Sequence, residues 1–418
     1  MYDVVVIGAG ASGLMAAITA AKADAKVLVV EGLSEYGKKI TMTGNGKCNL
    51  TNDAAGDISH YHTDDEELLK GILSEVTPEA LLEEFNSLGL LCREKNGYWY
   101  PYHENAGLVR DLLGQRLYDY GGQIETGRFL TGITSLLPSR DPEYDAGYRY
   151  IVGGHSARKC IIATGSLAGR VFSGDDNEFY RLLNHPSPIP FIPYVPSLCK
   201  CYVSDEEKKR ISYLKGLRVK GKVTLLTDNE EVKDDYGEIQ FTEDALSGIV
   251  VFNLSGYVSE AIGEGKTCSL KLDLLPEYSF EEMKSILEKR YADGLRYAKA
   301  LLGGIFSDKL LNLLCKENGI DPSVKKNDLA IESALNVIRL AKAYKFDIAG
   351  TAGFKDAQVA RGGVPLSDMT PELMHKRFRE IYICGEVLNV DGECGGFNLH
   401  FAFASGIIAG RSAAKKAL

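Results

Sequence analysis

The sequence predicts an α/β fold in which both ends of the chain build one parallel-sheet domain around a long inserted segment. A Val-rich run at residues 2–7 leads into a glycine-rich turn, as expected where a buried parallel strand meets a helix. A second apolar run, residues 379–385, ends in a glycine near the C-terminus. Between them, residues 219–227 and 238–254 are rich in strand-forming residues, which indicates an inserted β-rich domain.

Composition narrows the class of protein. With 418 residues the chain is long enough for two or three domains. Its net charge is −9 with scattered Lys and Arg, which argues against nucleic acid as a partner. Nine Cys without a repeating spacing indicate reduced thiols in a cytoplasm. Because the first strand is expected to begin at Tyr2, we expect no signal peptide, and no apolar run approaches the roughly 18 residues that span a bilayer.

The N-terminal glycines form a G-x-G-x-x-G pattern directly after the first strand. Gly8 allows the tight turn, Gly10 lets the backbone approach a pyrophosphate, and Gly13 lets helix and strand pack closely. The helix expected at residues 12–23 presents free N–H groups to the phosphates. A second strand, residues 26–30, ends at Glu31, whose carboxylate can accept bonds from an adenosine ribose. This order of elements predicts a Rossmann-type dinucleotide site.

Three later features favour FAD over NAD. The loop at residues 41–52 has two glycines, Gly44 and Gly46, that expose backbone N–H groups, and it supplies short polar side chains. An apolar strand ends in Thr164-Gly165, and a late strand ends in Gly385-Glu386, whose acid can bond a ribityl chain. No second G-x-G-x-x-G is present for a pyridine nucleotide.

The segment GECGGFNLHFAFASG, residues 392–406, has a doubled glycine before an uncharged apolar helix pattern. Gly395 and Gly396 would let backbone approach the isoalloxazine ring. We expect Asn398 to cap a helix that starts near Leu399. The positive end of that helix would favour negative charge developing on the flavin.

The middle of the chain predicts further elements. Residues 105–121 have helical spacing, and a strand follows at 123–133, where Leu130 is placed to reach the adenine side of the cofactor. Ser279 with Glu282 forms a capping box that opens a helical block reaching about residue 344. The expected division is a first part of the FAD domain at 1–195, a β-rich domain at 196–276, a helical subdomain at 277–345 and the second part of the FAD domain at 346–418.

Across nearly its whole length the chain resembles the aminoacetone-oxidase-like, or BaiN-like, family of FAD-binding NAD(P)/FAD-dependent oxidoreductases. The resemblance rests on GAGASG, KKITMTGNGKCNLTN, GEIQFTEDALSG, FKDAQVARGGV and GEVLNVDGECGGFNLHFAFASG. It implies a discontinuous Rossmann-type FAD-binding domain with an inserted β-barrel-like domain and a helical subdomain. After Ala163-Thr164-Gly165 the family continues with a second glycine, whereas this chain continues SLAGRVFSGDDNEFYRLL.

The motifs and the resemblance together give one expected set of cofactor-contacting residues. The resemblance itself implies contacts at Ser12, Glu31, Lys38, Lys39, the Gly44–Gly46 turn, Asn49, Glu386 and Asn398. The full set is Gly8, Gly10, Ala11, Ser12, Gly13, Glu31, Gly32, Lys38, Lys39, Thr43, Gly44, Asn45, Gly46, Cys48, Asn49, Leu130, Ala163, Thr164, Gly165, Gly385, Glu386, Gly395, Gly396, Phe397, Asn398 and Leu399.

Catalytic side chains are not assigned by the sequence. Cys48 and Cys394 lie in the expected flavin loops, but no C-x-x-C pair is present, and a small buried Cys is common. His400 can act as an acid or base near the flavin, or can pack with its ring nitrogens bonded. Cys199-x-Cys201 is only a pair, so we expect no metal site.

We therefore expect an FAD-dependent oxidoreductase that transfers a hydride through flavin N5 to or from a small organic substrate of the amine, ketone or enone class. Either oxygen reoxidises the flavin or NAD(P)H, as a transient donor, reduces it. Two alternatives remain, which are a flavin-dependent RNA-modifying enzyme and a non-catalytic flavin-binding redox sensor.

Overall fold

The chain divides into two compact units, described here from a computed structural model. Unit 1 comprises Met1–Ser197 and Gly353–Leu418, and unit 2 comprises Leu198–Ala352. The structure describes residues 1–138, 140–169, 182, 188–322 and 329–415, without the side chain of Asn45. Most of the segment 166–183, which departs from the family pattern, therefore lies outside the described residues. None of the described helices is long and apolar enough to cross a membrane.

Unit 1 is built on a seven-stranded sheet of order β7-β2-β1-β10-β9-β8, with β19 also paired to β10. The strands β7, β2, β1, β10 and β19 are parallel, and β9 and β8 add an antiparallel edge. The late strand β19 thus joins the N-terminal sheet, which confirms the discontinuous Rossmann-type domain. The bounds are β1 Tyr2–Ile7, β2 Val27–Val30, β7 Gln123–Glu125, β8 Ile133–Ser135, β9 Tyr150–Val152, β10 His155–Ile162 and β19 Ile381–Ile383.

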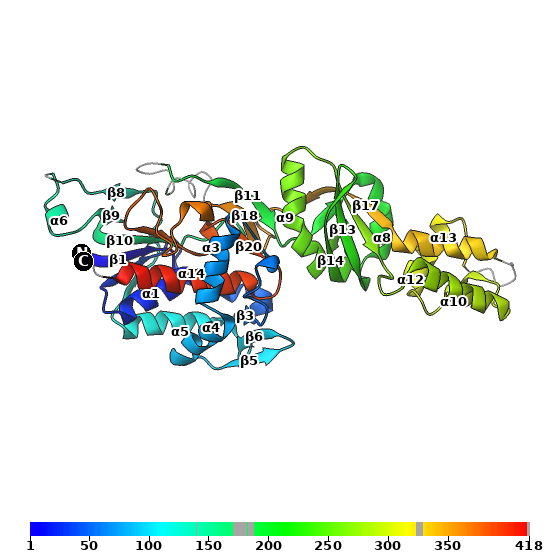
Figure 1. Cartoon of the computed structure of the whole chain (residues 1–418), viewed down its shortest axis with the longest axis horizontal. Coiled ribbons are helices and arrows are strands. Elements are labelled where there is room, and N and C mark those ends of the chain that lie inside the picture. Colours follow the sequence, from blue (N-terminus) through cyan, green and yellow to red (C-terminus); the bar gives the residue numbers. More distant parts are fainter. Residues whose placement is uncertain (139, 170–181, 183–187, 323–328, 416–418) are drawn as a thin grey trace. The chain divides into compact units, whose positions relative to one another are not determined.

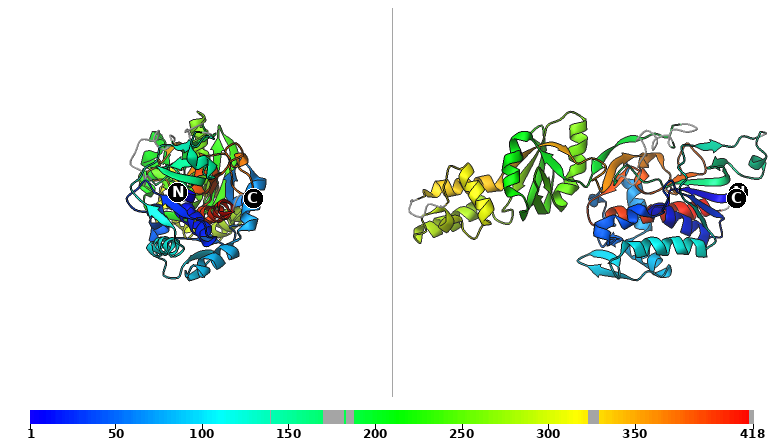
Figure 2. Two further views of the ribbon diagram at one scale, coloured as in Figure 1. Left: turned by 90° about the vertical axis from the view of Figure 1, so that its left-hand side faces the viewer. Right: turned by 180° about the vertical axis from the view of Figure 1, so that it is seen from behind.

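Helix α1, Ala11–Lys22, packs directly on the C-terminal helix α14, Phe397–Ala414 (Figure 1, blue and red). Two glycines make this approach possible. A Cβ at Gly406 would lie 2.5 Å from the carbonyl oxygen of Ser12, and one at Gly410 would lie 2.2 Å from that of Ala16. Because Ser12 meets Gly406 and Ala16 meets Gly410, the two helices run in the same direction where they cross. Figure 2 shows this contact from behind.

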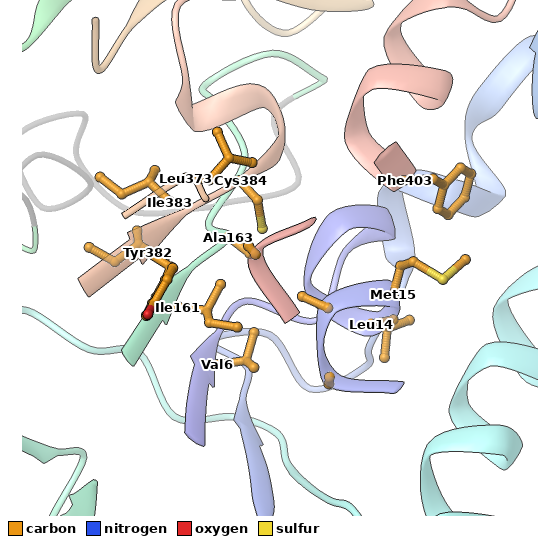
Figure 3. Close-up of a cluster of buried hydrophobic side chains, with 14 of the residues drawn as sticks. Val6, Leu14, Met15, Ile161, Ala163, Leu373, Tyr382, Ile383, Cys384 and Phe403 are labelled. Atoms are coloured by element: carbon orange, nitrogen blue, oxygen red, sulfur yellow. The ribbon is translucent and has the colours of Figure 1, made fainter. Parts of the chain in front are cut away.

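The core of unit 1 joins these helices to the sheet. Figure 3 shows Val6, Ile161 and Ile383 from three strands in one apolar cluster with Leu14 of α1 and Phe403 of α14. The remaining helices are α2 Lys38–Thr41, α3 Glu66–Glu75, α4 Pro78–Ser87, α5 Ala106–Asp119 and α6 Pro142–Asp145, with 3-10 turns η1 Thr43–Gly46, η2 Ile58–His60, η4 Leu366–Asp368 and η5 Gly385–Val387. Small sheets pair β3 Thr51–Asn52, β6 Tyr98–Pro101 and β5 Cys92–Lys95, then β4 Tyr61–Thr63 with β20 Val390–Gly392, and β11 Ile192–Ser197 with β18 Val359–Gly363.

Unit 2 contains a closed antiparallel barrel and a group of helices around one shared core. This confirms the inserted barrel and the helical subdomain. Residues 346–352, expected in the second part of the FAD domain, lie in unit 2 because β17 closes the barrel. The strands are β12 Cys201–Val203, β15 Ala245–Ser247, β14 Glu230–Phe241, β13 Arg218–Thr227, β16 Cys268–Asp273 and β17 Tyr344–Thr351, and the helices are η3 Asp205–Glu207, α8 Lys208–Leu214, α9 Ile249–Gly263, α10 Phe280–Ala292, α11 Ala298–Leu302, α12 Asp308–Glu317 and α13 Ile331–Lys342.

Two strand predictions are wrong. The run at 238–254 contains the end of β14 and the short strand β15, but its last residues, from Ile249, form helix α9. That helix is buried on almost all sides, so it has no polar face to reveal its period. The strand expected at 123–133 is two short strands, and Leu130 lies in the irregular segment between them. By contrast, the Ser279 capping box is present and opens α10 as predicted.

We predict that Gly410→Ala lowers the free energy of unfolding of unit 1 by about 1–3 kcal/mol, because the added methyl group overlaps backbone. The matched control is Gly71→Ala in α3, where a Cβ meets nothing within 4 Å and a gain of about 0.5–1 kcal/mol is expected. Urea unfolding followed by the fluorescence of the single tryptophan, Trp99, reports on unit 1. Equal stability of both variants would contradict the proposed packing.

Candidate functional site

The G-x-G-x-x-G turn at Gly8–Gly13, called the glycine finger below, leaves three backbone N–H donors without a partner among the described residues at the start of α1. Gly10 precedes the helix without a side-chain cap, and the first helical bond is made by the N–H of Leu14. The N–H groups of Ala11, Ser12 and Gly13 have no acceptor in the described part of the chain. A Cβ at Gly10 would meet nothing within 4 Å, so space is open beside these donors.

The other two finger glycines serve protein packing. Gly8 has a φ of +102°, and a Cβ there would lie 2.4 Å from the carbonyl oxygen of Ala163. A Cβ at Gly13 would lie 2.0 Å from the carbonyl oxygen of Gly8. Strand, turn and helix therefore close tightly around the open face at Gly10, as the pattern predicts.

Glu31 lies at the end of β2, directly beside the finger. Its Oε2 accepts the N–H of Ala9 at 2.7 Å, and its Oε1 accepts the N–H of Leu33 at 2.8 Å. The carboxylate is thus fixed next to the glycine turn, where the sequence expects the adenosine ribose. The neighbouring Gly32 faces Phe129, and Leu130 contacts Gly153 in the turn between β9 and β10.

The loop after β2 combines open glycines with one buried polar atom. Gly44 and Gly46 have φ values of +43° and +78°, and a Cβ at either would meet nothing within 4 Å. Thr43 Oγ1 donates to the carbonyl of Ile40 and steadies the turn. Asn49 Oδ1 is buried without a hydrogen-bond donor among the described residues, so it can accept a bond from a ligand. The side chain of the expected residue Asn45 lies outside the described residues, and Lys38 is exposed.

Glu386 connects four separate segments of unit 1. Its Oε2 forms an ion pair with Lys39 Nζ at 2.5 Å. Its Oε1 accepts Ser166 Oγ at 2.7 Å and the N–H of Ala360 at 3.1 Å, and its carbonyl accepts Tyr194 Oη at 3.3 Å. Ser166, Ala360 and Tyr194 were missed from the sequence, because only the fold brings them to Glu386.

Around Glu386, two glycines shape the backbone. Gly385 has a φ of +77°, and a Cβ there would lie 2.2 Å from Ser12 Oγ, so it packs against the first turn of α1. Gly165, after Thr164, has a φ of +73° and faces open space. The late G-E motif is therefore adjacent to the finger, as the sequence predicts.

Asn398 does not cap α14, which corrects the sequence prediction. The helix begins at Phe397, two residues before Leu399, and its cap residue is Gly396. The Asn398 side-chain amide instead forms two hydrogen bonds with the backbone of Gly392, which precedes the helix. It accepts a bond from the Gly392 N–H at 2.9 Å and donates one to the Gly392 carbonyl at 2.7 Å. With no side-chain cap, the N–H groups of Phe397, Asn398 and Leu399 have no acceptor among the residues that the structure describes.

The doubled glycine is required by protein contacts. Gly395 has a φ of +128°, and a Cβ there would lie 2.7 Å from Tyr98. Gly396 has a φ of +96°, and a Cβ there would lie 2.9 Å from Asn49 Oδ1. Asn52 Nδ2 donates to the carbonyl of Gly395 at 3.1 Å. These glycines therefore place the start of α14 against the loop that carries Asn49.

These features fit an FAD molecule. The α1 start offers three donors for a pyrophosphate, and the α14 start offers three more. From the pairing of Ser12 with Gly406, the two starts are offset by about 12 Å along their shared direction at 1.5 Å per residue. A dinucleotide is long enough to contact both. Gly10, Gly44, Gly46 and Gly165 face the open space that such a ligand needs.

The thiol of Cys48 and the imidazole of His400 are both poorly suited to act as a catalytic acid or base. Burial raises the pKa of the Cys48 thiol to about 12, which does not fit a reactive thiolate. His400 is fully buried, with Nδ1 2.9 Å from Thr51 Oγ1, and burial lowers its pKa to about 4. His400 is therefore a neutral packing residue near neutral pH.

Comparison with known proteins shows similarity along almost the whole chain. A family model described as the HI0933-like protein Rossmann domain matches residues 2–412. The chain is 34% identical to the 3-dehydro-bile acid delta(4,6)-reductase of Clostridium scindens over all of both chains. It is 26% identical to the ribosomal RNA dihydrouridine synthase of Haemophilus influenzae over 96% of each chain, and 25% identical to that of Escherichia coli over 97% of this chain and 96% of the other.

We predict that Glu31→Ala weakens FAD binding by about 1.5–3 kcal/mol, because a charge-assisted bond to the ribose is lost. The control is Glu35→Ala, an exposed carboxylate a few residues further on. Titration of the flavin-free protein with FAD measures both. Unchanged affinity in Glu31→Ala would show that Glu31 does not hold the ribose.

We predict that the free energy of unfolding falls between pH 6.5 and pH 4 because of His400. The unfolded chain binds a proton near pH 6.5 while the folded chain resists it until about pH 4, so acidification favours unfolding by up to about 3 kcal/mol. In His400→Gln this component is absent. Urea unfolding across this pH range tests the difference, and identical pH slopes would refute it.

Proposed function

The chain belongs to the HI0933-like family of Rossmann-domain proteins and is an FAD-dependent oxidoreductase, and from this premise we propose that it reduces a carbon–carbon double bond conjugated to a carbonyl group. Membership agrees with the BaiN-like resemblance of its motifs. The proposal narrows the expected substrates from amines, ketones and enones to the last of these.

The chemistry common to the named relatives carries the proposal. A 3-dehydro-bile acid with double bonds at positions 4 and 6 is a ketone conjugated to those bonds. Dihydrouridine is formed by reducing the uracil double bond that is conjugated to a ring carbonyl. Both reactions add a hydride to one carbon of a polarised double bond and a proton to its neighbour.

For this chain we propose a small apolar enone rather than RNA as substrate. Identity to the bile-acid reductase is 34% over both whole chains, against 26% and 25% for the two RNA-modifying relatives. The net charge is −9. Several cations on the barrel are held in ion pairs, among them Arg218 with Glu238, Lys222 with Asp234 and Lys215 with Glu243. Paired cations in an acidic chain are poorly suited to bind a phosphate backbone.

The chain's own residues would bind and orient the cofactor, which when bound supplies two-electron hydride chemistry. The α1 start and Gly10 would take the pyrophosphate, Glu31 the ribose, and the α14 start the pyrimidine side of the ring. Glu386 is already engaged by Lys39, Ser166 and Ala360, so its main role is to hold these segments around the ribityl chain. We propose NAD(P)H as the electron donor that binds transiently.

An anaerobic screen tests the proposal. NADH or NADPH is expected to bleach the flavin absorbance, and a 3-oxo-4-ene steroid is then expected to restore it with formation of the saturated ketone. Amines should not reduce the flavin. Reoxidation by a uridine-containing ribosomal RNA transcript but not by the enone would instead establish the RNA-modifying alternative, and no turnover with any of these compounds would contradict the proposal.

A further inference from the structure

Two histidine–carboxylate pairs form a short ladder beside the start of α14. In the antiparallel pairing of β4 with β20, His62 lies opposite Asp391, and the N–H of Glu393 bonds the carbonyl of His60 at 2.9 Å. His60 Nδ1 is 2.8 Å from Glu393 Oε2, and His62 Nδ1 is 3.3 Å from Asp391 Oδ1. The sequence H-x-H therefore matches D-x-E across the strands, a relation that only the register reveals.

The rung formed by His62 and Asp391 is fixed by a buried ion pair. Arg361 Nε is 3.0 Å from Asp391 Oδ1, and both side chains are 4% exposed. Burial alone would raise the pKa of Asp391, but the Arg361 guanidinium and His62 hold it below its usual value. Ser197 Oγ also donates to Asp391 at 3.3 Å. The charged cluster anchors β20 between β4 and β18.

The rung formed by His60 and Glu393 opens outward. The His60 side chain is 33% exposed, and its ring stacks on Phe397 at 4.6 Å and 25°. Phe397 is the first residue of α14, whose uncapped start is the expected flavin contact. The Glu393 carboxylate accepts a hydrogen bond from His60 Nδ1, and His60 Nε2 makes no hydrogen bond to the described residues. Among the described residues, Asp57 is a further charged group beside His60, and the Asp391–Arg361–His62 cluster forms the neighbouring rung.

We propose that His60 is the catalytic acid of the conjugate reduction, with Glu393 and Phe397 as positioning residues. This inference rests on the proposed function and names the source of its proton. The bound cofactor would supply hydride chemistry at one carbon of the double bond, and the electron pair of that double bond would then reside on the carbon beside the carbonyl. That carbon takes the proton from Nε2 of the His60 imidazolium, so an N–H bond breaks and a C–H bond forms. The neutral imidazole regains a proton from water.

Glu393 positions the imidazole ring in this arrangement. Its bond to Nδ1 leaves Nε2, on the other side of the ring, to face the substrate. Asn398 steadies this turn because its amide also reaches the Glu393 carbonyl at 3.4 Å. The aromatic stack on Phe397 limits rotation of the ring.

Nitrogen NMR tests the geometry without turnover. In the purified chain labelled at its seven histidines, the His60 signals are assigned from their loss in His60→Gln. At a pH where the ring is neutral, the proton is expected on Nδ1, and Glu393→Gln is expected to move population to the Nε2–H tautomer. A wild-type proton on Nε2 would overturn the proposed orientation.

Half-reaction kinetics test the role. In His60→Gln, the rate of flavin reduction by the pyridine nucleotide is expected to stay within a few-fold of wild type, while reoxidation by the enone falls about 100-fold or more. In D₂O, wild type is expected to place deuterium on one face of the carbon beside the carbonyl, and the variant to give a mixture. Glu393→Asp should recover part of the rate lost in Glu393→Gln.

His155→Gln is the matched control, because His155 Nε2 also lies 3.1 Å from a carboxylate, that of Glu125, but elsewhere in unit 1. Its two half-reactions should match wild type. Unchanged enone reoxidation and stereochemistry in His60→Gln would overturn the role of His60 while leaving the proposed function intact. Failure of the wild type to react with the enone would instead contradict the proposed function.

Discussion

The close contact between α1 and α14 is the constraint on which the rest of unit 1 depends. Gly406 and Gly410 place their backbone against the carbonyls of Ser12 and Ala16, where a single Cβ would overlap. Since α1 follows the first strand and α14 is the last helix, this contact joins the two ends of the chain. It also sets the direction and the offset of the two uncapped helix starts, and thereby the length of ligand that can contact both.

Ion pairs and hydrogen bonds then fix the segments around these two helices. Glu386 gathers Lys39, Ser166 and Ala360, while Asp391 with Arg361 anchors the strand that leads into α14. A buried ion pair costs desolvation free energy, so its value here lies in fixing positions rather than in net stability. Asn398, Gly395 and Gly396 convert that anchored strand into the start of a helix.

Much of this arrangement could be predicted from local sequence. The G-x-G-x-x-G turn, the β1 strand, the α5 helix and the Ser279 capping box depend on neighbours within one or two turns, and all are present. Three features could not be predicted in this way. Helix α9 is buried on nearly all sides, so its sequence shows no helical periodicity of polar and apolar residues. The Asn398 side chain bonds to the backbone of Gly392 instead of capping α14. The pairing of His60 with Glu393 spans the inserted unit and depends on strand register.

The most direct test of the central claim is a comparison of FAD and FMN binding to the flavin-free protein. FMN retains the ring and ribityl phosphate but lacks the adenosine half that the finger and Glu31 are expected to hold. Measured by flavin fluorescence, FAD is predicted to bind once per chain and at least 100-fold more tightly than FMN, a difference of about 2.7 kcal/mol. Equal affinities, or no binding of FAD at all, would contradict a dinucleotide site spanning the two helix starts.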